Sequence, residues 1–373
     1  MTFQLNTRLI LGEGTLQRTS EQALAYGVHH PLIITDQGMV ATGMVDVLAQ
    51  SLQSAGLDVD LFSSVESDPG KATVIRAAEA YKHANCDGII ALGGGSPIDC
   101  AKATAVLVSN PGPLDDYFGI GKVNQPLPVV FAIPTTVGTG SEVTTFAVIS
   151  DNEKHKKMVI GSPLIAPHTA ILDPEVVASL PDRIVAATGM DAMAHAIESI
   201  LSVFATPFSD ALALEAVSLV QKNIIPAVCS KDPIARAQLL YASTLAGYAF
   251  SNARTGLVHG MAHPIGSYHH VHHGLAIAIL LPTVMAFNQP CCSDKLARIA
   301  TAMNGPARAE AAVEGVRILN SEVGIPARLS DVGVTTEYLE VMARDAFESG
   351  NAQVVNPRKP TYAEVLELYQ QVL

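Results

Sequence analysis

The sequence predicts an α/β domain over residues 1–180 followed by an all-α domain over residues 181–373. Short β-branched runs alternate with amphipathic helical stretches in the first part, which is typical of parallel strands joined by crossover helices. After residue 180 the sequence changes to long segments rich in Ala, Leu, Val and Met with helical periodicity. A glycine-rich turn in the first part and paired histidines in the second are the candidate ligand sites.

Length and composition indicate a compact globular protein. The chain has 373 residues, 49% of them hydrophobic and 16% charged, and a formal net charge of -12. An acidic chain argues against nucleic acid or an anionic membrane as the main partner. Its five cysteines are odd in number and include the adjacent Cys291 and Cys292, which fits a reducing cytoplasm. The longest apolar run, 274–287, is broken by Pro282 and is too short for a membrane span. We therefore expect a soluble cytoplasmic protein.

Several segments have patterns clear enough to assign. The expected strands are 31–35, 59–63, 87–92 and 128–133, and the expected helices of the first domain include 44–55 and 72–84. The expected helices of the second domain include 191–204, 209–221, 233–249 and 289–303. Ligands of such α/β domains bind at the carboxyl ends of the strands, and a cleft between the two domains is the expected position for a site.

A run of three glycines, 93–95, follows the expected strand 87–92 and opens a helix. The glycines let a ligand approach the backbone closely, Pro97 suits the first turn, and Ser96 with Asp99 forms a pattern like a capping box. The helix amino terminus then offers free N–H groups to a pyrophosphate. The alternative is a tight strand-to-helix turn, for which one glycine would suffice. The order of strand, glycines and helix favours a dinucleotide-binding, Rossmann-like domain.

Two further features fit a nucleotide, whereas a third segment only mimics a nucleotide-binding motif. The loop 133–142 follows a strand and supplies hydroxyls and small residues that could line the ligand. Asp36, directly after a strand, is placed to accept hydrogen bonds from ribose hydroxyls and to repel a 2'-phosphate, although an aspartate there is often only a turn residue. We therefore expect NAD(H) rather than NADP(H). The segment 12–14 resembles a dinucleotide fingerprint but lacks its third glycine.

Paired polar residues in the second domain predict a metal site. Asp191 and His195 are four residues apart in a helical segment, so both side chains leave one face. His259 and His263 repeat that spacing, and His273 follows them. One such pair is ordinarily a buried, hydrogen-bonded structural feature. Two pairs in strongly apolar sequence favour a shared ligand, because burying so many polar groups without one is costly. A carboxylate with imidazoles suits iron(II) or zinc(II).

Residues and order together resemble the iron-containing (group III) alcohol dehydrogenases. The resemblance spans nearly the whole chain. It rests on segment 93–102, Pro134-Thr135-Thr136, Lys157-Met158, Leu172-Asp173-Pro174, Thr188-Gly189-Met190-Asp191-Ala192, segment 259–266 and Asn356-Pro357-Arg358. It implies a dinucleotide-binding α/β domain, a helical domain and one divalent metal.

The resemblance also implies roles for individual residues. The metal ligands are Asp191, His195, His259 and His273, and His263 lies nearby, unligated, where it can relay the alcohol proton as the catalytic acid or base. The nucleotide contacts are Asp36, Gly94, Gly95, Ser96, Thr135, Thr136 and Lys157, with Asp68 at a further cofactor position. Phe250 matches a position in the substrate pocket.

The chain departs from the family pattern at a few positions. Asp68 stands where many members have Asn, which puts that cofactor contact in doubt. Ile277 replaces a usual Asn after the last ligand, and Arg254 is unusual in its turn. The resemblance assigns no role to His269, His270 and His272, for which a surface position is the default.

Both lines of reasoning predict hydride transfer between NAD(H) and a small primary alcohol or its aldehyde. The metal would polarise the substrate oxygen while the cofactor carries the hydride. A related polyol or glycerol dehydrogenase is the nearest alternative, and a metal-dependent hydrolase, which needs no dinucleotide, is the alternative from another class. The resemblance implies a homodimer or a larger homo-oligomer.

Overall fold

A computed structural model describes residues 2–151 and 156–373 of the chain. The chain divides into two compact units. One, the α/β unit, comprises residues 5–136 and 140–179, and the other, the helical unit, comprises residues 180–373 with the short segments 2–4 and 137–139.

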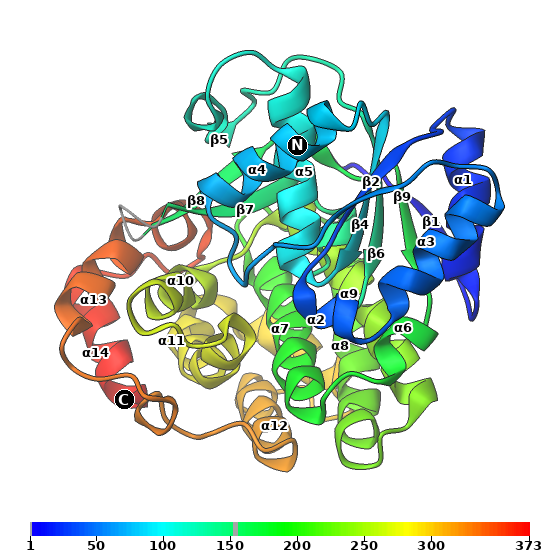
Figure 1. Cartoon of the computed structure of the whole chain (residues 1–373). Helices are drawn as coiled ribbons and strands as arrows, with labels where there is room; N and C mark the ends of the chain where they lie inside the picture. The colour runs from blue at the N-terminus through cyan, green and yellow to red at the C-terminus, as the bar shows by residue number, and fades with distance from the viewer. Residues whose placement is uncertain (1, 152–155) are drawn as a thin grey trace. The chain divides into compact units, whose positions relative to one another are not determined.

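The α/β unit is built on a six-stranded parallel sheet (Figure 1). Its strands lie in the order β1-β9-β6-β4-β2-β3, and every described pair is parallel. The four strands expected from the sequence are confirmed, whereas β1 and β9 were not predicted. The bounds are β1 Arg8–Leu11, β2 Pro31–Ile34, β3 Asp60–Phe62, β4 Gly88–Gly93, β6 Val129–Pro134 and β9 Thr169–Leu172.

Helices of this unit cover the sheet and bury alternate strand residues. Leu32 and Ile34 of β2, with Ile89 and Ala91 of β4, share one core cluster with apolar residues of α4 and α5. This alternation follows from the two-residue period of a strand. The bounds are α1 Thr19–Ala25, α2 Gln37–Ala41, α3 Met44–Ser54, α4 Lys71–His83, α5 Gly95–Ser109 and α6 Glu175–Ala178, with the 3₁₀ helices η1 Thr15–Arg18, η2 Leu114–Tyr117, η3 Ser141–Val143 and η4 Pro163–Ile165.

A second, three-stranded sheet in the same unit has the order β5-β8-β7. Its strands are β5 Gly119–Ile120, β7 Phe146–Asp151 and β8 Lys156–Gly161, and β7 pairs with β8 in antiparallel register. These strands were not predicted from the sequence, because a short apolar run such as 146–149 in β7 does not by itself distinguish a strand from another element.

The helical unit confirms the expected all-α half, since residues 180–373 contain no strand. Its α helices are α7 Asp182–Leu201, α8 Pro207–Cys229, α9 Pro233–Ala253, α10 Leu257–His269, α11 His273–Ala302, α12 Ala309–Glu322, α13 Leu339–Glu348 and α14 Tyr362–Val372. Two short elements, the 3₁₀ helix η5 Ser330–Val332 and the π-helical turn η6 Asn351–Val355, complete it. The segment expected as a separate helix, 289–303, is the second part of α11, which has a non-helical residue at Cys292.

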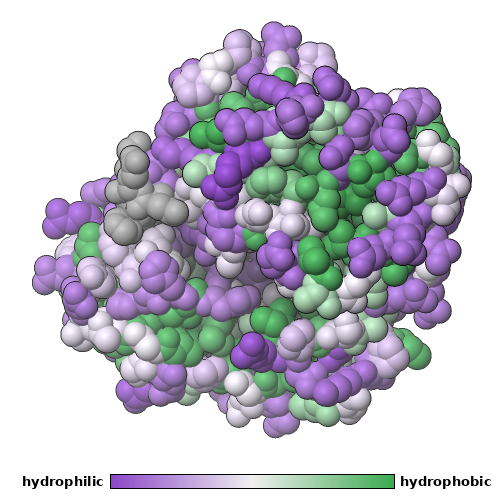
Figure 2. All heavy atoms as spheres, in the orientation of Figure 1, coloured by the Kyte–Doolittle hydropathy of each residue, from purple (hydrophilic) through white to green (hydrophobic). Residues whose placement is uncertain are grey.

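Helix α7 is the centre of the helical unit and packs against α8, α9 and α11 (Figure 1). By length and composition alone, α7, α8 and α11 are apolar enough to cross a membrane, but 94% of the relevant window of α7 is buried inside the protein. Its apolar character is therefore that of a core helix. The face of the molecule drawn in Figure 2 mixes hydrophilic and hydrophobic residues. The expectation that no membrane is involved stays a prediction.

Candidate functional site

Helix α7 presents three buried polar side chains on one face. Asp191, His195 and Glu198 are spaced i, i+4 and i+7, so they lie along the same stripe of the helix. Asp191 is 2% exposed, His195 5% and Glu198 4%, in a helix whose other buried residues are mostly apolar. Polar groups buried to this extent require partners. The i+7 position of Glu198 was a usable signal that the sequence reasoning missed.

The predicted metal ligands converge on one carboxylate oxygen. His259 Nε2 lies 3.8 Å from Asp191 Oδ1, and His195 Nδ1 lies 3.9 Å from the same oxygen. One ligand atom from each of these three residues can be chosen so that all lie within 4.8 Å of one another. His273, the first residue of α11, places its Nε2 4.0 Å from Asp191 Oδ1. Helices α7, α10 and α11 therefore bring together all four residues that were predicted as metal ligands.

The donor atoms fit a bound cation. Asp191 Oδ1 and His259 Nε2 are buried, and neither has a hydrogen-bond partner within the described part of the chain. An acceptor left unpaired in the interior costs about 1–3 kcal/mol, so two that face each other call for a common partner. Both are acceptors when the carboxylate is ionised and Nε2 carries no proton, so a cation satisfies both at once. The absence of thiolates fits a borderline divalent metal such as iron or zinc.

Outer contacts orient two of the imidazoles. His259 Nδ1 is 2.5 Å from Glu198 Oε2, which leaves Nε2 to face Asp191. The other Glu198 oxygen accepts a hydrogen bond from the Val258 backbone N–H at 2.7 Å, which holds the carboxyl at the start of α10. His195 Nδ1 lies 3.1 Å from the Gly138 carbonyl oxygen, so Nδ1 donates its proton there and Nε2 is available as a ligand. Such partners fix the tautomer of a ligating histidine.

Burial sets the protonation of the site. It raises the pKa of the Asp191 carboxyl well above its usual range, and the neighbouring Glu198 charge adds to this. Burial likewise lowers the pKa of His195 well below its usual range and that of His259 to about 3, so both rings are neutral and can bind a metal. Burial also raises the pKa of Glu198 to about 8, and hydrogen bonds from backbone N–H groups oppose this rise. A cation favours the ionised carboxylate, so it opposes the effect of burial on Asp191.

Two further residues lie beside the cluster. The Phe250 ring stacks on His195 with ring centroids 4.2 Å apart and planes inclined by 15°. The His263 ring stacks on His273 at 5.5 Å and meets His259 edge-on at 6.2 Å. Both therefore lie next to the ligand set, as the resemblance implied. The His273 side chain is 34% exposed, in contrast to 3% for Asp191, so His273 marks the accessible side of the centre.

Close packing of the backbone brings the ligand-bearing segments together. A Cβ on Gly274 would lie 2.5 Å from the Ala187 carbonyl oxygen, and a Cβ on Gly138 would lie 2.4 Å from the Thr188 carbonyl oxygen. Both positions therefore tolerate only glycine. Because Gly274 follows His273 directly, this contact sets how closely that ligand approaches α7.

The glycine-rich turn of the α/β unit lies at the carboxyl end of β4. Helix α5 begins at Gly95 and its N-cap residue is Gly94, which has no side chain to cover the free backbone N–H groups. Gly93 has φ 156°, and a Cβ there would lie 2.5 Å from Pro97 Cγ. The turn thus presents backbone donors at a helix amino terminus, the arrangement that binds phosphate groups.

The predicted capping box at this helix is wrong. Ser96 lies inside α5, and its Oγ accepts the backbone N–H of Asp68 at 3.1 Å. Asp99 instead accepts from Ser141 Oγ at 2.5 Å and from the Val148 backbone N–H at 2.9 Å. The carboxylate is therefore used to tie α5 to η3 and β7, because two donors on those elements lie within its reach.

The remaining nucleotide candidates also lie in the α/β unit. The Thr135 backbone N–H bonds the Gly93 carbonyl at 3.0 Å, and Thr136 Oγ1 is buried without a partner among the residues described. Asp68, at φ 57°, places Oδ1 2.6 Å from Lys157 Nζ, so the departure from Asn makes an ion pair with another candidate. Asp36 is the N-cap of α2 and accepts the Met39 N–H at 2.9 Å, the structural role weighed above.

The other unusual residues have structural surroundings. The Arg254 guanidinium, at a residue with φ 66°, lies over the Phe204 ring at 4.8 Å. Ile277 is fully buried in α11. His270 and His272 are exposed, whereas the half-buried His269 meets the Tyr338 ring edge-on at 5.5 Å.

A parallel α/β unit with a phosphate-type turn, together with an all-α unit that holds a carboxylate and imidazole centre, defines the class of metal-dependent, dinucleotide-linked oxidoreductases. Comparison with known proteins makes this more specific. Residues 6–174 match the family described as iron-containing alcohol dehydrogenase, and residues 185–373 match the Fe-containing alcohol dehydrogenase family, C-terminal. The chain belongs to the iron-containing alcohol dehydrogenase family.

Individual relatives agree over their whole length. The NAD-dependent methanol dehydrogenase of Bacillus methanolicus is 35% identical over 372 residues, which cover 98% of this chain and 97% of that protein. The crystal structure of a 1,3-propanediol oxidoreductase covers 100% of both chains with a TM-score of 0.96 and 36% identity. Sulfoacetaldehyde reductase from Bifidobacterium kashiwanohense in complex with NAD+ has a TM-score of 0.92 and 29% identity over 100% of this chain and 98% of that one. The protein is a metal-dependent, NAD-linked oxidoreductase of alcohols and aldehydes.

Proposed function

We propose that this enzyme interconverts short primary alcohols and their aldehydes, with iron(II) held by Asp191, His195, His259 and His273. The proposal rests on two buried atoms, Asp191 Oδ1 and His259 Nε2, that have no hydrogen-bond partner among the residues described. When bound, the metal supplies a Lewis acid for the substrate oxygen and NAD(H) supplies or accepts the hydride.

The chain's own residues hold this centre in a single arrangement. Asp191 contributes the one negative charge among the proposed ligands, which offsets part of a divalent charge in a buried site. Glu198 accepts a hydrogen bond from the His259 Nδ1–H and thereby keeps Nε2 free for the metal. The Gly138 carbonyl does the same for His195. Because the ligands sit on three helices, metal binding also links α7, α10 and α11.

The metal proposed is iron, with zinc as the alternative. Both ions accept carboxylate and imidazole ligands, so the donor set alone fits either. The preference for iron rests on the family to which the chain belongs.

Next to the ligands, His263 is proposed as the residue that relays the alcohol proton. Its ring lies against His273, the most accessible of the ligands, at 5.5 Å between centroids. An imidazole can take up and release a proton near neutral pH, and such help contributes on the order of 100-fold to 10,000-fold in rate. Phe250, stacked on His195, supplies an apolar wall for a short carbon chain.

The cofactor proposed is NAD(H). The free N–H groups at the start of α5, from Gly95 and Ser96, bind its pyrophosphate, and Gly94 leaves the approach open. Thr136 Oγ1 is an unpartnered hydroxyl at the same end of the sheet, and Lys157 is a cation already ordered by Asp68. One Asp36 oxygen caps α2, so the other is proposed to accept from the ribose hydroxyls.

A diol is the second candidate substrate. The relative with a TM-score of 0.96 is described as a 1,3-propanediol oxidoreductase, so a second hydroxyl on a short chain is the specific alternative. If the enzyme is more active on 1,3-propanediol than on 1-propanol at equal concentration, the result would favour a diol as the substrate.

The test is a screen of NADH oxidation with short aldehydes. Enzyme stripped by a chelator should be inactive, should regain activity with iron(II), and should regain less with zinc(II). A stripped enzyme that keeps full activity contradicts the metal proposal. A screen in which no short aldehyde or alcohol reacts, although one equivalent of metal is bound, contradicts the substrate class.

The roles of the two histidines of α10 are tested by a pair of variants. His259→Ala should lose bound metal, whereas His263→Ala should keep one equivalent of metal and lose turnover. Mass spectrometry of the native protein gives the first quantity, and the rate of alcohol oxidation gives the second. The reverse pattern of metal retention would exchange the two roles.

Assembly and location are also proposed. A homodimer or larger homo-oligomer follows from the family resemblance, and a cytoplasmic location agrees with five cysteines that are all free. No nucleic acid or membrane partner is proposed, in keeping with the net charge of -12.

A further inference from the structure

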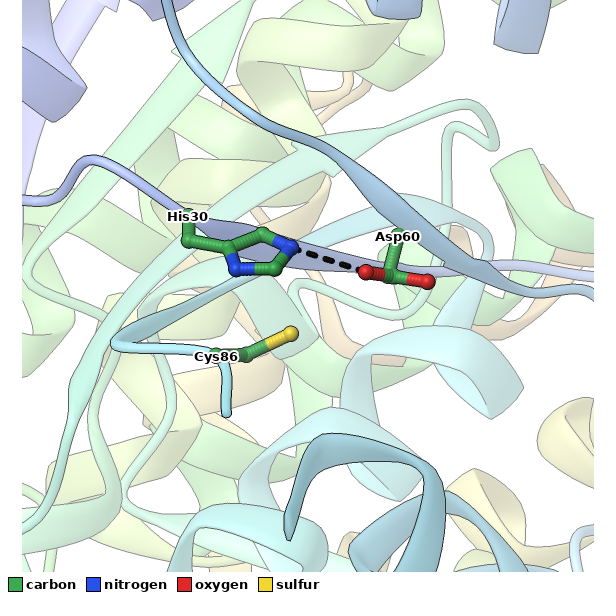
Figure 3. A group of neighbouring side chains, drawn as sticks. All are labelled: His30, Asp60 and Cys86. Atoms are coloured by element: carbon green, nitrogen blue, oxygen red, sulfur yellow. Dashed lines mark hydrogen bonds and ion pairs between the residues drawn. The ribbon is translucent and has the colours of Figure 1, made fainter. Parts of the chain in front are cut away.

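A second group of metal-binding side chains lies at the opposite end of the parallel sheet from the glycine-rich turn (Figure 3). His30 directly precedes β2, Asp60 is the first residue of β3, and Cys86 lies two residues before β4. Because these strands are parallel, their first residues share the amino edge of the sheet. Strand β4 has six residues, so about 20 Å of backbone separates this edge from the cofactor turn.

The three side chains meet closely. His30 Nε2 and Asp60 Oδ2 are 2.8 Å apart, and one ligand atom from each of His30, Asp60 and Cys86 lies within 4.8 Å of the other two. Figure 3 shows the Asp60 carboxylate facing the His30 ring, with the Cys86 side chain drawn below that ring. Cys86 is 8% exposed, whereas the side chains of His30 and Asp60 are 27% and 50% exposed. The group is therefore reached from solvent on one side and closed by the protein on the other.

The backbone that carries these side chains is fixed. Both oxygens of Asp87 accept backbone N–H groups, from His29 and from His30, each at 2.8 Å. The Asp87 N–H in turn bonds the His30 carbonyl at 3.0 Å. The start of β2 is thus held against the start of β4, which keeps His30 and Cys86 together. The Asp87 carboxylate also adds negative charge beside the thiol, an environment that attracts a cation.

The chemistry of the donors selects the ion. A thiolate, an imidazole and a carboxylate together suit zinc(II), which takes all three in four-coordinate sites. A hard cation such as magnesium or calcium prefers oxygen ligands alone and has little use for the sulfur. Three protein ligands on an accessible edge leave the fourth position to water.

We propose that His30, Asp60 and Cys86 form a second divalent-metal site, selective for zinc(II)-like ions and separate from the catalytic centre. On binding, the cation takes the position of the proton that Nε2 of His30 donates to Asp60. The imidazole stays neutral by carrying its proton on Nδ1, and the Cys86 thiol releases its proton to solvent as the metal–sulfur bond forms. The occupied site ties together the first residues of β2, β3 and the segment before β4, so it stabilises the α/β unit.

Cobalt(II) is the probe that distinguishes the two sites. The catalytic centre has no cysteine ligand, so only the second site can give the near-ultraviolet charge-transfer band of a cobalt–thiolate bond. We expect the metal-stripped enzyme to bind two equivalents of cobalt, with the band following one of them. Added zinc should remove the band and raise the melting temperature.

Matched variants assign the band. Cys86→Ser and His30→Ala should lose the band and one equivalent of cobalt while they keep alcohol oxidation, and Cys229→Ser, which changes an exposed cysteine elsewhere, should keep both. Asp191→Ala should lose the other equivalent and keep the band, so a failure of the catalytic proposal is distinguishable from a failure of this one. If Cys86→Ser does not fold, the exposed Asp60→Asn takes its place. Absence of the band in the wild type, or its persistence in Cys86→Ser or His30→Ala, overturns the proposal and leaves an ordinary hydrogen-bonded His–Asp pair.

Discussion

The metal centre of the helical unit and the glycine-rich turn of the α/β unit recruit their ligands in opposite ways. At the metal centre the ligand atoms belong to side chains, and buried partners such as Glu198 fix how those side chains point. At the turn the donors are backbone amides, and residues 93–95 contribute by having no side chain at all. The metal centre therefore depends on the side-chain atoms that its residues supply, whereas the turn depends on the lack of side-chain atoms at its glycines.

This difference decides what kind of change each region tolerates. A substitution at the metal centre removes a charge or a lone pair and leaves the fold with an uncompensated polar group. A substitution at Gly93 of the turn adds atoms where Pro97 leaves no room for them and strains a conformation that only glycine adopts easily. Metal content and cofactor affinity should therefore respond to different sets of variants.

The largest effect is expected for Asp191→Ala. The change removes the only carboxylate among the proposed ligands, so bound metal should fall from one equivalent to nearly none while the fold survives. Loss of a Lewis acid worth several kcal/mol lowers turnover by on the order of 1,000-fold or more. Metal analysis and the rate of alcohol oxidation measure the two losses. The control Asp46→Ala, an exposed carboxylate of α3, should change neither. An Asp191→Ala enzyme with full metal content would show that the carboxylate is not a ligand.

A smaller effect is expected for Glu198→Gln, which keeps the shape of the side chain and removes its charge. His259 then loses the carboxylate that accepts its Nδ1 proton, and metal affinity should fall about 10-fold to 100-fold. Competition with a chelator of known affinity measures the change. Asp210→Asn is the matched control, because Asp210 is a buried carboxylate that pairs with Arg298 away from the centre. Equal losses in the two variants would mean that Glu198 acts only through general stability.

At the turn, Gly93→Ala tests whether backbone space alone governs the cofactor site. The residue has φ 156° and its new Cβ would lie 2.5 Å from Pro97 Cγ, so the free energy of unfolding should fall by about 1–3 kcal/mol. Affinity for NADH should weaken while bound metal stays at one equivalent. Titration of NADH fluorescence follows the first quantity, and Gly350→Ala, where a Cβ meets nothing within 4 Å, is the control. Loss of metal in Gly93→Ala would break the separation between the two regions.

The smallest effect is expected for Asp36→Gly. This variant tests the part of the proposed cofactor site that depends on a side chain rather than on the backbone. Removing the carboxylate removes its repulsion of a 2'-phosphate, so the preference for NAD(H) should narrow by roughly tenfold, or about 1.4 kcal/mol. Glycine is an acceptable N-cap, so α2 should lose only a few tenths of a kcal/mol. The ratio of kcat/KM for the two cofactors is the measurement. A wild type that already prefers NADP(H) would rule out the placement of Asp36 near the ribose.

Sequence patterns predicted the features that repeat at a fixed period. The spacing of Asp191 with His195 placed both on one helical face, and the apolar run 89–92 marked a buried strand. No local period relates His273 to the other ligands, so the residue pattern placed it only near the two pairs, and the family resemblance specified it as a ligand.

Features that depend on distant partners were missed or misassigned. The local sequence predicts Asp99 as a capping residue. In the folded chain its carboxylate instead accepts hydrogen bonds from Ser141 and Val148, which belong to later elements. Strand β1 has four residues and its only partner, β9, is far along the chain, so no local pattern marked it. Local sequence indicates the conformation and the contacts that a residue favours, whereas its actual partners depend on which distant groups the fold brings next to it.

The pairing of β1 with β9 has a consequence for how the protein is made. Arg8 lies opposite Thr169 and Leu11 opposite Leu172, so β1 leaves the ribosome long before its neighbour in the sheet. Asp173 closes the same join, since its carboxylate accepts the backbone N–H groups of Gly14 and Leu16. Contacts of such long sequence separation slow folding. During synthesis β1 therefore waits for its partner in this sheet until β9 has emerged.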